Sequence, residues 1–68
     1  MNLLKIYYAC KDKKDMYWRD FGGTMNGSYV LETKYLFANY HKARELAKRK
    51  SLRIVEVSLI ETGANIVH

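Results

Sequence analysis

The sequence has 68 residues, of which 49% are hydrophobic and 28% charged, with no proline and one cysteine. This length fits one domain, since domains usually need roughly 50–200 residues. One cysteine excludes an internal disulfide scaffold, and no window approaches the roughly 20 apolar residues of a membrane span. One Trp, six Tyr and two Phe argue against disorder. We therefore expect a small, soluble, basic globular domain over residues 1–68.

The formal net charge of +5 is concentrated in one part of the chain. Residues 42–53 hold six bases and one acid, whereas the remaining residues hold six bases and six acids. The six bases are Lys42, Arg44, Lys48, Arg49, Lys50 and Arg53. A localised positive field of this kind raises the local concentration of anions and speeds their encounter with the protein.

The N-terminal half of the chain predicts strands. Leu3–Cys10 alternates as a first strand, and a charged turn over residues 11–15 leads to a second strand over Met16–Phe21, so we expect a hairpin. Residues 22–28 are rich in glycine and indicate a connecting loop, because glycine and asparagine tolerate a positive φ. An interrupted third strand is expected within Tyr29–Phe37.

The C-terminal half predicts one helix and one strand. Asn39 is a suitable N-cap for a helix over Tyr40–Lys50, whose last turn of three bases suits the negative end of the helix dipole. The apolar stripe of this helix is Tyr40, Ala43, Leu46 and Ala47. Arg53–Glu61 predicts the last strand, and residues 62–68 are expected to be a flexible tail.

The order β-β-β-α-β predicts an α+β fold, with a small antiparallel sheet of three to four strands and one amphipathic helix packed on one face. The residues expected beneath the helix are Leu4, Ile6, Tyr8, Trp18, Val55, Val57 and Leu59. The opposite, open face of the sheet would then carry Lys5, Tyr7, Tyr17, Arg19 and Glu56.

Motifs for catalysis are missing. Cys10 lies within a predicted strand, far in sequence from His41 and His68, and these three residues match no metal-ligand spacing. The loop Gly22–Ser28 lacks the Gly-Lys-Ser/Thr ending of a phosphate-binding loop. We therefore expect no enzyme, no cofactor and no metal. A small hydrolase stays as a remote alternative, which would need a cleft joining His41 or Cys10 to a carboxylate.

Two surfaces are candidates for binding. The open sheet face, with Lys5, Tyr7, Tyr17 and Arg19, carries the residue types that anchor protein interfaces, although cross-strand Tyr pairing also explains them. The basic helix face, formed by the six bases above, suits phosphates or an acidic protein, although a solvated helix face also explains it. The leading expectation is a non-enzymatic protein-binding protein, and the alternative is a nucleic-acid-binding protein that uses the helix. A homodimer remains open.

The N-terminus indicates a location. Lys5 interrupts the apolar run of Met1–Cys10, and the charged residues 11–15 follow it, so this segment does not read as a signal peptide. We expect a cytoplasmic protein with a reduced cysteine and no membrane association.

A set of short segments resembles small open reading frames of bacteriophages and prophages, which are mostly of unknown function. The segments are Ile6-Tyr7-Tyr8, Met16-Tyr17-Trp18, Leu36-Phe37-x-x-Tyr40-x-x-Ala43 and Arg53-Ile54-Val55-Glu56-Val57. The resemblance implies an N-terminal hairpin, one helix and a closing strand. It also implies a context, since many small phage proteins bind and inhibit a host machine, including CRISPR nucleases. The basic helix does not fit an inhibitor that mimics DNA, which should be acidic.

Overall fold

The computed structural model of the chain describes the backbone of residues 3–61 and the side chains of residues 4–59. The elements in chain order are β1 (Leu3–Lys11), β2 (Tyr17–Phe21), β3 (Thr24–Ser28), the 3-10 turn η1 (Thr33–Tyr35), α1 (Tyr40–Lys50) and β4 (Arg53–Glu61). The four strands form one antiparallel sheet in the order β3-β2-β1-β4. The expected α+β fold with one helix is therefore confirmed.

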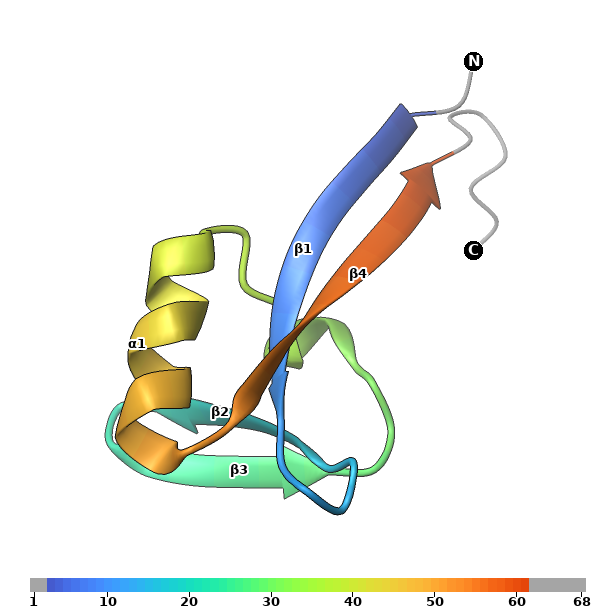
Figure 1. The fold of residues 1–68 in the computed structure, drawn as a ribbon. Coiled ribbons are helices and arrows are strands. Elements are labelled where there is room, and N and C mark those ends of the chain that lie inside the picture. The colour runs from blue at the N-terminus through green and yellow to red at the C-terminus, as the bar shows by residue number, and fades with distance from the viewer. Residues whose placement is uncertain (1–2, 62–68) are drawn as a thin grey trace.

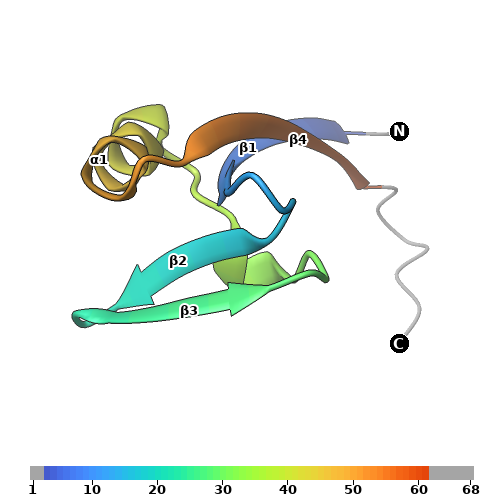
Figure 2. The same cartoon turned by 60° about the horizontal axis from the view of Figure 1, so that its bottom comes forward.

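The sheet consists of two halves that meet at the C-terminal end of β1. Strands β1 and β4 pair along their whole length, from Leu3 opposite Glu61 to Lys11 opposite Arg53. Strand β1 meets β2 at only two positions, whereas β2 and β3 pair at five. Figure 2 shows the result, a β2–β3 hairpin that lies apart from the long β1–β4 ribbon except near the Lys11 end.

The third strand lies earlier in the chain than the sequence analysis predicted. Gly22 and Gly23 form a two-residue turn with φ of 59° and 91°, and β3 begins at the next residue. Turns of this kind need a positive φ at both central residues, which glycine adopts without strain. The expected strand within Tyr29–Phe37 is wrong, since this segment holds η1 and one isolated bridge between Phe37 and Tyr8. The predicted tail over 62–68 lies outside the described residues.

Helix α1 begins and ends where the sequence predicted. The side chain of Asn39 accepts a hydrogen bond of 2.8 Å from the backbone N–H of His41, which confirms the N-cap. At the other end Ser51 adopts a left-handed φ of 56°, and its N–H donates to the carbonyl of Ala47. This conformation stops the helix and turns the chain directly into β4.

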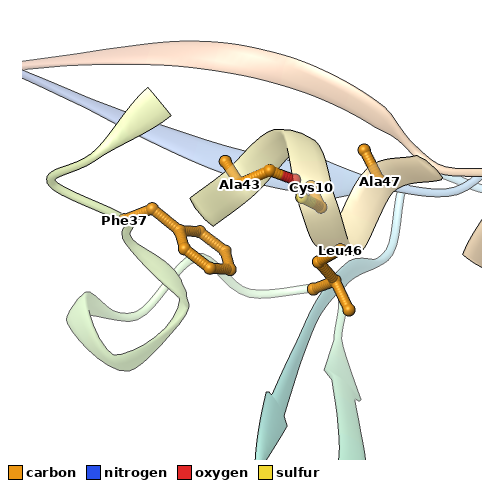
Figure 3. Packing of buried hydrophobic residues seen from close by; sticks show 5 residues of the cluster. All are labelled: Cys10, Phe37, Ala43, Leu46 and Ala47. Atoms are coloured by element: carbon orange, nitrogen blue, oxygen red, sulfur yellow. Dashed lines mark hydrogen bonds between the residues drawn. The ribbon is translucent and has the colours of Figure 1, made fainter. Parts of the chain in front are cut away.

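The core lies between α1 and the Lys11 half of the ribbon. Figure 3 shows its five buried members, which are Cys10, Phe37, Ala43, Leu46 and Ala47. Tyr8, Met25, Leu52 and Ile54 are partly buried and pack against them. The core thus joins both halves of the sheet, because Cys10 belongs to β1 and Met25 to β3.

The predicted layer beneath the helix is wrong for β4. Val55, Val57 and Leu59 pair with Ala9, Tyr7 and Lys5, so their side chains share the face opposite to that of Cys10. Ile54, which pairs with Cys10, packs against the core in their place. The prediction placed the side chains of β4 one residue out of register with those of β1. A shift of one residue moves every side chain of a strand to the other face of the sheet.

The layer is also shorter than expected. An 11-residue helix such as α1 is about 16 Å long, whereas the nine-residue strands β1 and β4 span about 30 Å. In Figure 1 the ribbon accordingly continues beyond the side of the helix, toward the N- and C-terminal ends of the chain. Leu4 and Ile6, which were expected in the core, are 62% and 45% exposed.

Candidate functional site

The end of the ribbon away from Lys11 exposes apolar side chains on both faces. We call this part the distal ribbon and define it as residues 4–7 of β1 and 57–59 of β4. Leu4 and Ile6 lie on the same face as Cys10, whereas Leu59, 40% exposed, lies on the opposite face beside its partner Lys5. Within the described residues no helix or further strand covers these side chains, and a two-stranded ribbon without such a cover is marginally stable by itself.

The edges of the distal ribbon carry no further strand within the described residues. On β1, pairing on the side away from β4 begins at Tyr8, which exchanges hydrogen bonds of 2.9 and 2.7 Å with Phe37. On β4, β1 is the single neighbour in the described sheet. As far as residues 3–61 show, the backbone N–H and C=O groups along these edges are therefore available to an added strand.

The structure separates the four residues predicted for the open sheet face. Lys5 and Tyr7 belong to the distal ribbon. Tyr17 instead pairs with Lys11, which is about 20 Å from Lys5 along β1, and the Lys11 ammonium lies 4.7 Å from the centre of its ring. The expected single surface is thus divided between two regions.

Arg19, the fourth of these residues, makes contacts within the protein. Its guanidinium lies 4.1 Å from the centre of the buried Phe37 ring and donates a hydrogen bond to the carbonyl of Leu36. A half-buried arginine held in this way fastens the segment before α1 onto β2. Spacing in the sequence does not reveal this role, because the contacts cross from β2 to a segment without regular structure.

The six bases of the predicted helix face have three different environments. Arg49 pairs with Asp20 at 3.2 Å, and Arg53 pairs with Asp15. Lys50 lines a groove beside the end of the helix. The other three bases are exposed and make no ion pair within the described residues; they are Lys42, Arg44 and Lys48.

The groove beside Lys50 was not anticipated from the sequence. It has a volume of about 440 Å³ and lies between the β1–β2 turn, residues 50–52 and Tyr29. Its apolar lining is Met16, Trp18 and Leu52, and its basic lining is Lys13, Lys14 and Lys50. We call it the Trp18 groove. The available signal was the short distance in sequence from Lys13 and Lys14 to Tyr17 and Trp18, but a charged turn alone predicts solvated side chains.

Trp18 is held in one orientation from two sides. A Cβ atom added to Gly27 would lie 2.8 Å from atoms of the indole, so the ring rests directly on the backbone of β3. The indole Nε1 donates a hydrogen bond of 2.9 Å to the carboxylate of Asp12. The ring therefore lines the groove with little freedom to turn.

Asp12 organises the β1–β2 turn. Besides the bond from Trp18, its carboxylate accepts hydrogen bonds from the backbone N–H groups of Lys14 and Met16 at 2.8 and 3.0 Å. The pKa of Asp12 is lowered, first by the Trp18 hydrogen bond and then by that from Met16, because these bonds favour the ionised form. Its ionised carboxylate is therefore held by three hydrogen-bond donors.

The residues considered for catalysis are not joined in a site. Cys10 is fully buried and its thiol donates a hydrogen bond of 3.3 Å to the carbonyl of Ala43. Burial raises the pKa of Cys10, and the positive charge of Arg19 opposes this in part. His41 is exposed on α1, and His68 lies outside the described residues. No cluster of three potential metal ligands occurs within the part of the chain that the structure describes.

Comparison with known proteins gives no further guide. No protein-family model matches the chain, and no curated protein or solved structure is significantly similar to it. Among the described residues, α1 is too short and too polar to cross a membrane. The distal ribbon and the Trp18 groove are therefore the two surfaces from which a function can be proposed.

Proposed function

We propose that the chain is a non-enzymatic binding protein that captures an acidic partner protein through the distal ribbon. The observation that carries this proposal is the exposure of Leu4, Ile6 and Leu59 on both faces of a ribbon that extends beyond the core. Clustered apolar side chains at the surface of a small protein are typical of an interaction site.

The chemistry of the distal ribbon favours a protein rather than a nucleic acid. Lys5 is its one charged residue, which is too little charge to attract a phosphate backbone. Tyr7 is half-buried and supplies an aromatic anchor of the kind found at the centre of protein interfaces. The open edges of β1 and β4 allow a partner to add a strand, while the neighbouring side chains fill its pockets.

The charge of the chain favours an acidic partner. The net charge is +5, and Lys42, Arg44 and Lys48 are exposed without an ion-pair partner among the described residues. A positive field speeds the encounter with a negatively charged protein and excludes basic ones. The resemblance to small phage proteins adds a finer proposal, in which the partner is a host protein such as a defence nuclease and the chain is its accessory or inhibitor.

The test compares two variants in affinity capture from a lysate of the source cell treated with nuclease. Leu4→Thr with Ile6→Thr removes the exposed apolar atoms, while threonine keeps the β-branched shape that strands prefer. Val30→Thr is the control, since Val30 is 65% exposed but lies outside the distal ribbon. We expect the double variant to lose the captured protein and the control to retain it. Titration of the purified partner should show a Kd about tenfold higher or more for the double variant.

Three results would contradict the proposal. The double variant could capture the partner as well as the unchanged protein does. Capture could disappear on nuclease treatment, which would assign the contact to nucleic acid. Light scattering could show a dimer that the double variant converts to a monomer, which would place a second copy of the chain on the distal ribbon.

A further inference from the structure

The Trp18 groove lies at the Lys11 end of the ribbon, away from the surface assigned above, and it presents a fixed aromatic ring. The indole rests on Gly27 and is oriented by its hydrogen bond to Asp12. Tyr29, 65% exposed, lines the same groove. Trp18 is partly exposed in this fixed position, and such a ring provides a platform on which a planar ring can stack without a large loss of side-chain freedom.

The lining of the groove is positively charged. Lys13 and Lys14 extend from the β1–β2 turn, and Lys50 extends from the end of α1 on the other side. None of these lysines forms an ion pair within the described residues. Asp12 is the one acid in the lining, and its carboxylate already accepts three hydrogen bonds. The groove therefore suits a ligand that combines an aromatic ring with negative charge.

The open shape of the groove favours one class among the ligands that combine an aromatic ring with negative charge. It is open to solvent, whereas sites for free small molecules enclose most of the ligand surface. In a duplex the bases are stacked on one another and cannot reach Trp18. A single strand has exposed bases together with a phosphate for each nucleotide, so it can follow an open groove with lysines on two sides.

We propose that the Trp18 groove binds single-stranded nucleic acid, with a base stacked on Trp18 and phosphates neutralised by Lys13, Lys14 and Lys50. This site shares Lys50 with the basic helix face that was expected to bind nucleic acid, but it does not include the exposed bases of the outer face of α1, which are Lys42, Arg44 and Lys48. It is also independent of the distal ribbon, so either proposal can fail without the other. Sequence preference is expected to be weak, because stacking accepts every base.

The probe is a fluorescently labelled oligothymidylate of about 12 nucleotides, a length within the usual range for such sites. Anisotropy measures its binding, and Trp18 emission reports the stacking directly because the chain has one tryptophan. We expect quenching of Trp18 on binding. With three phosphates neutralised, affinity should fall about 20-fold between about 50 and about 200 mM salt.

Two matched variants locate the site. The groove variant carries Lys13→Gln, Lys14→Gln and Lys50→Gln, and the control carries Lys42→Gln, Arg44→Gln and Lys48→Gln. Both remove three positive charges from exposed positions. We expect the groove variant to raise Kd about tenfold or more and to remove most of the salt dependence. The control should change Kd by less than about threefold, because it alters the general field alone.

Tyr29→Ala tests whether the second aromatic residue of the groove also stacks on a base. Tyr29 is 65% exposed, so its replacement does not disturb the core. It should raise Kd about fivefold or more, the usual effect of removing one stacked aromatic.

The proposal is overturned if the oligonucleotide does not bind at low salt, if Trp18 emission is unchanged, or if both triple variants lose affinity equally. It is also overturned if a duplex binds as tightly, or if a free nucleoside monophosphate competes at the same concentration. A loss confined to the control variant would assign binding to the outer face of α1.

Discussion

The two ends of the β1–β4 ribbon show how one alternating strand can serve two purposes. At the Lys11 end, Cys10 is fully buried because α1 covers it and β2 and β4 lie on its two sides. Six residues earlier on the same face, Leu4 is 62% exposed. The alternation of apolar residues is continuous between them, so hydropathy does not distinguish the two ends. The length of the helix that covers the strand makes the difference, and this length is a property of another part of the chain.

The largest expected effect tests the buried end. Leu46 is 1% exposed and lies at the centre of the core beside Cys10 and Phe37. Leu46→Ala should lower the free energy of unfolding by about 2–5 kcal/mol, since it removes buried methyl groups and leaves a cavity. Leu46→Met keeps the volume and should lose less than about 1.5 kcal/mol. Denaturant titration measures both losses. A loss for Leu46→Ala as small as the loss for Leu46→Met would show that Leu46 is not closely packed.

A second variant tests the packing within the β2–β3 hairpin, where Trp18 and Gly27 are directly paired. In Gly27→Ala the new methyl group would meet the Trp18 ring at 2.8 Å, so the ring or the strand must move. We expect a loss of about 1–3 kcal/mol in the free energy of unfolding, together with a shift in Trp18 emission. Asn26→Ala, at the neighbouring exposed position, is the control. An unshifted emission spectrum would show that the ring does not rest on Gly27.

The third prediction concerns pH and the β1–β2 turn. The pKa of Asp12 is lowered in the folded chain from its ordinary value of 3.8 by the hydrogen bond from Trp18 and those from the turn. A lowered pKa means that the ionised carboxylate stabilises the fold above pH 3.8, and that this contribution is lost as the pH falls through the folded-state pKa. Asp12→Asn should therefore reduce the pH dependence of the unfolding free energy below this value. Asn26→Ala, which changes no titratable group and leaves these hydrogen bonds intact, should not reduce it.

The smallest effect is expected at the exposed end. Leu4→Thr should change the free energy of unfolding by no more than about 0.5 kcal/mol, because Leu4 is 62% exposed, and Ile6→Thr, at a position 45% exposed, by no more than about 1 kcal/mol. The dependence of unfolding on denaturant concentration should also stay the same. A loss above about 1 kcal/mol for either variant would mean that the distal ribbon is covered in the free protein.

The strongly periodic parts of the chain could be predicted from the sequence. The helix Tyr40–Lys50 and its N-cap Asn39 are both confirmed, because propensity, capping and the apolar stripe indicate the same element. The strand Arg53–Glu61 is confirmed as well. The local sequence pattern indicates these elements, so they could be predicted without knowledge of the strand pairing.

The parts that depend on pairing could not be predicted in the same way. Strand β3 has the sequence Thr-Met-Asn-Gly-Ser, which lacks an apolar alternation, and it forms because β2 supplies a partner. The pair Gly22-Gly23 was the available signal, since such a pair at a two-residue turn places a strand directly after it. Along β4 apolar residues occupy both faces, so the face of Val55 and Val57 is decided by the register with β1.

Contacts between residues distant in the sequence also decide which residues share each of the two surfaces for which binding is proposed. The six bases near α1 are adjacent in sequence, yet the structure directs Lys50 into the Trp18 groove beside Lys13 and Lys14. Likewise, the Arg19 guanidinium contacts the buried Phe37 ring, although Arg19 was predicted to lie on the open sheet face. Local spacing in the sequence therefore did not reveal the neighbours that define each surface.

The pairing of β1 with β4 has a consequence for the order in which the chain folds. The two strands close a loop over residues 12–52, and closing a loop of this length costs about 3 kcal/mol of chain entropy before the pairing compensates for it. The β2–β3 hairpin, by contrast, joins residues separated by one tight turn and can form within about 10 μs. We therefore expect the hairpin and α1 to form early and the ribbon to close in the slowest step, so that the apolar strands β1 and β4 meet last.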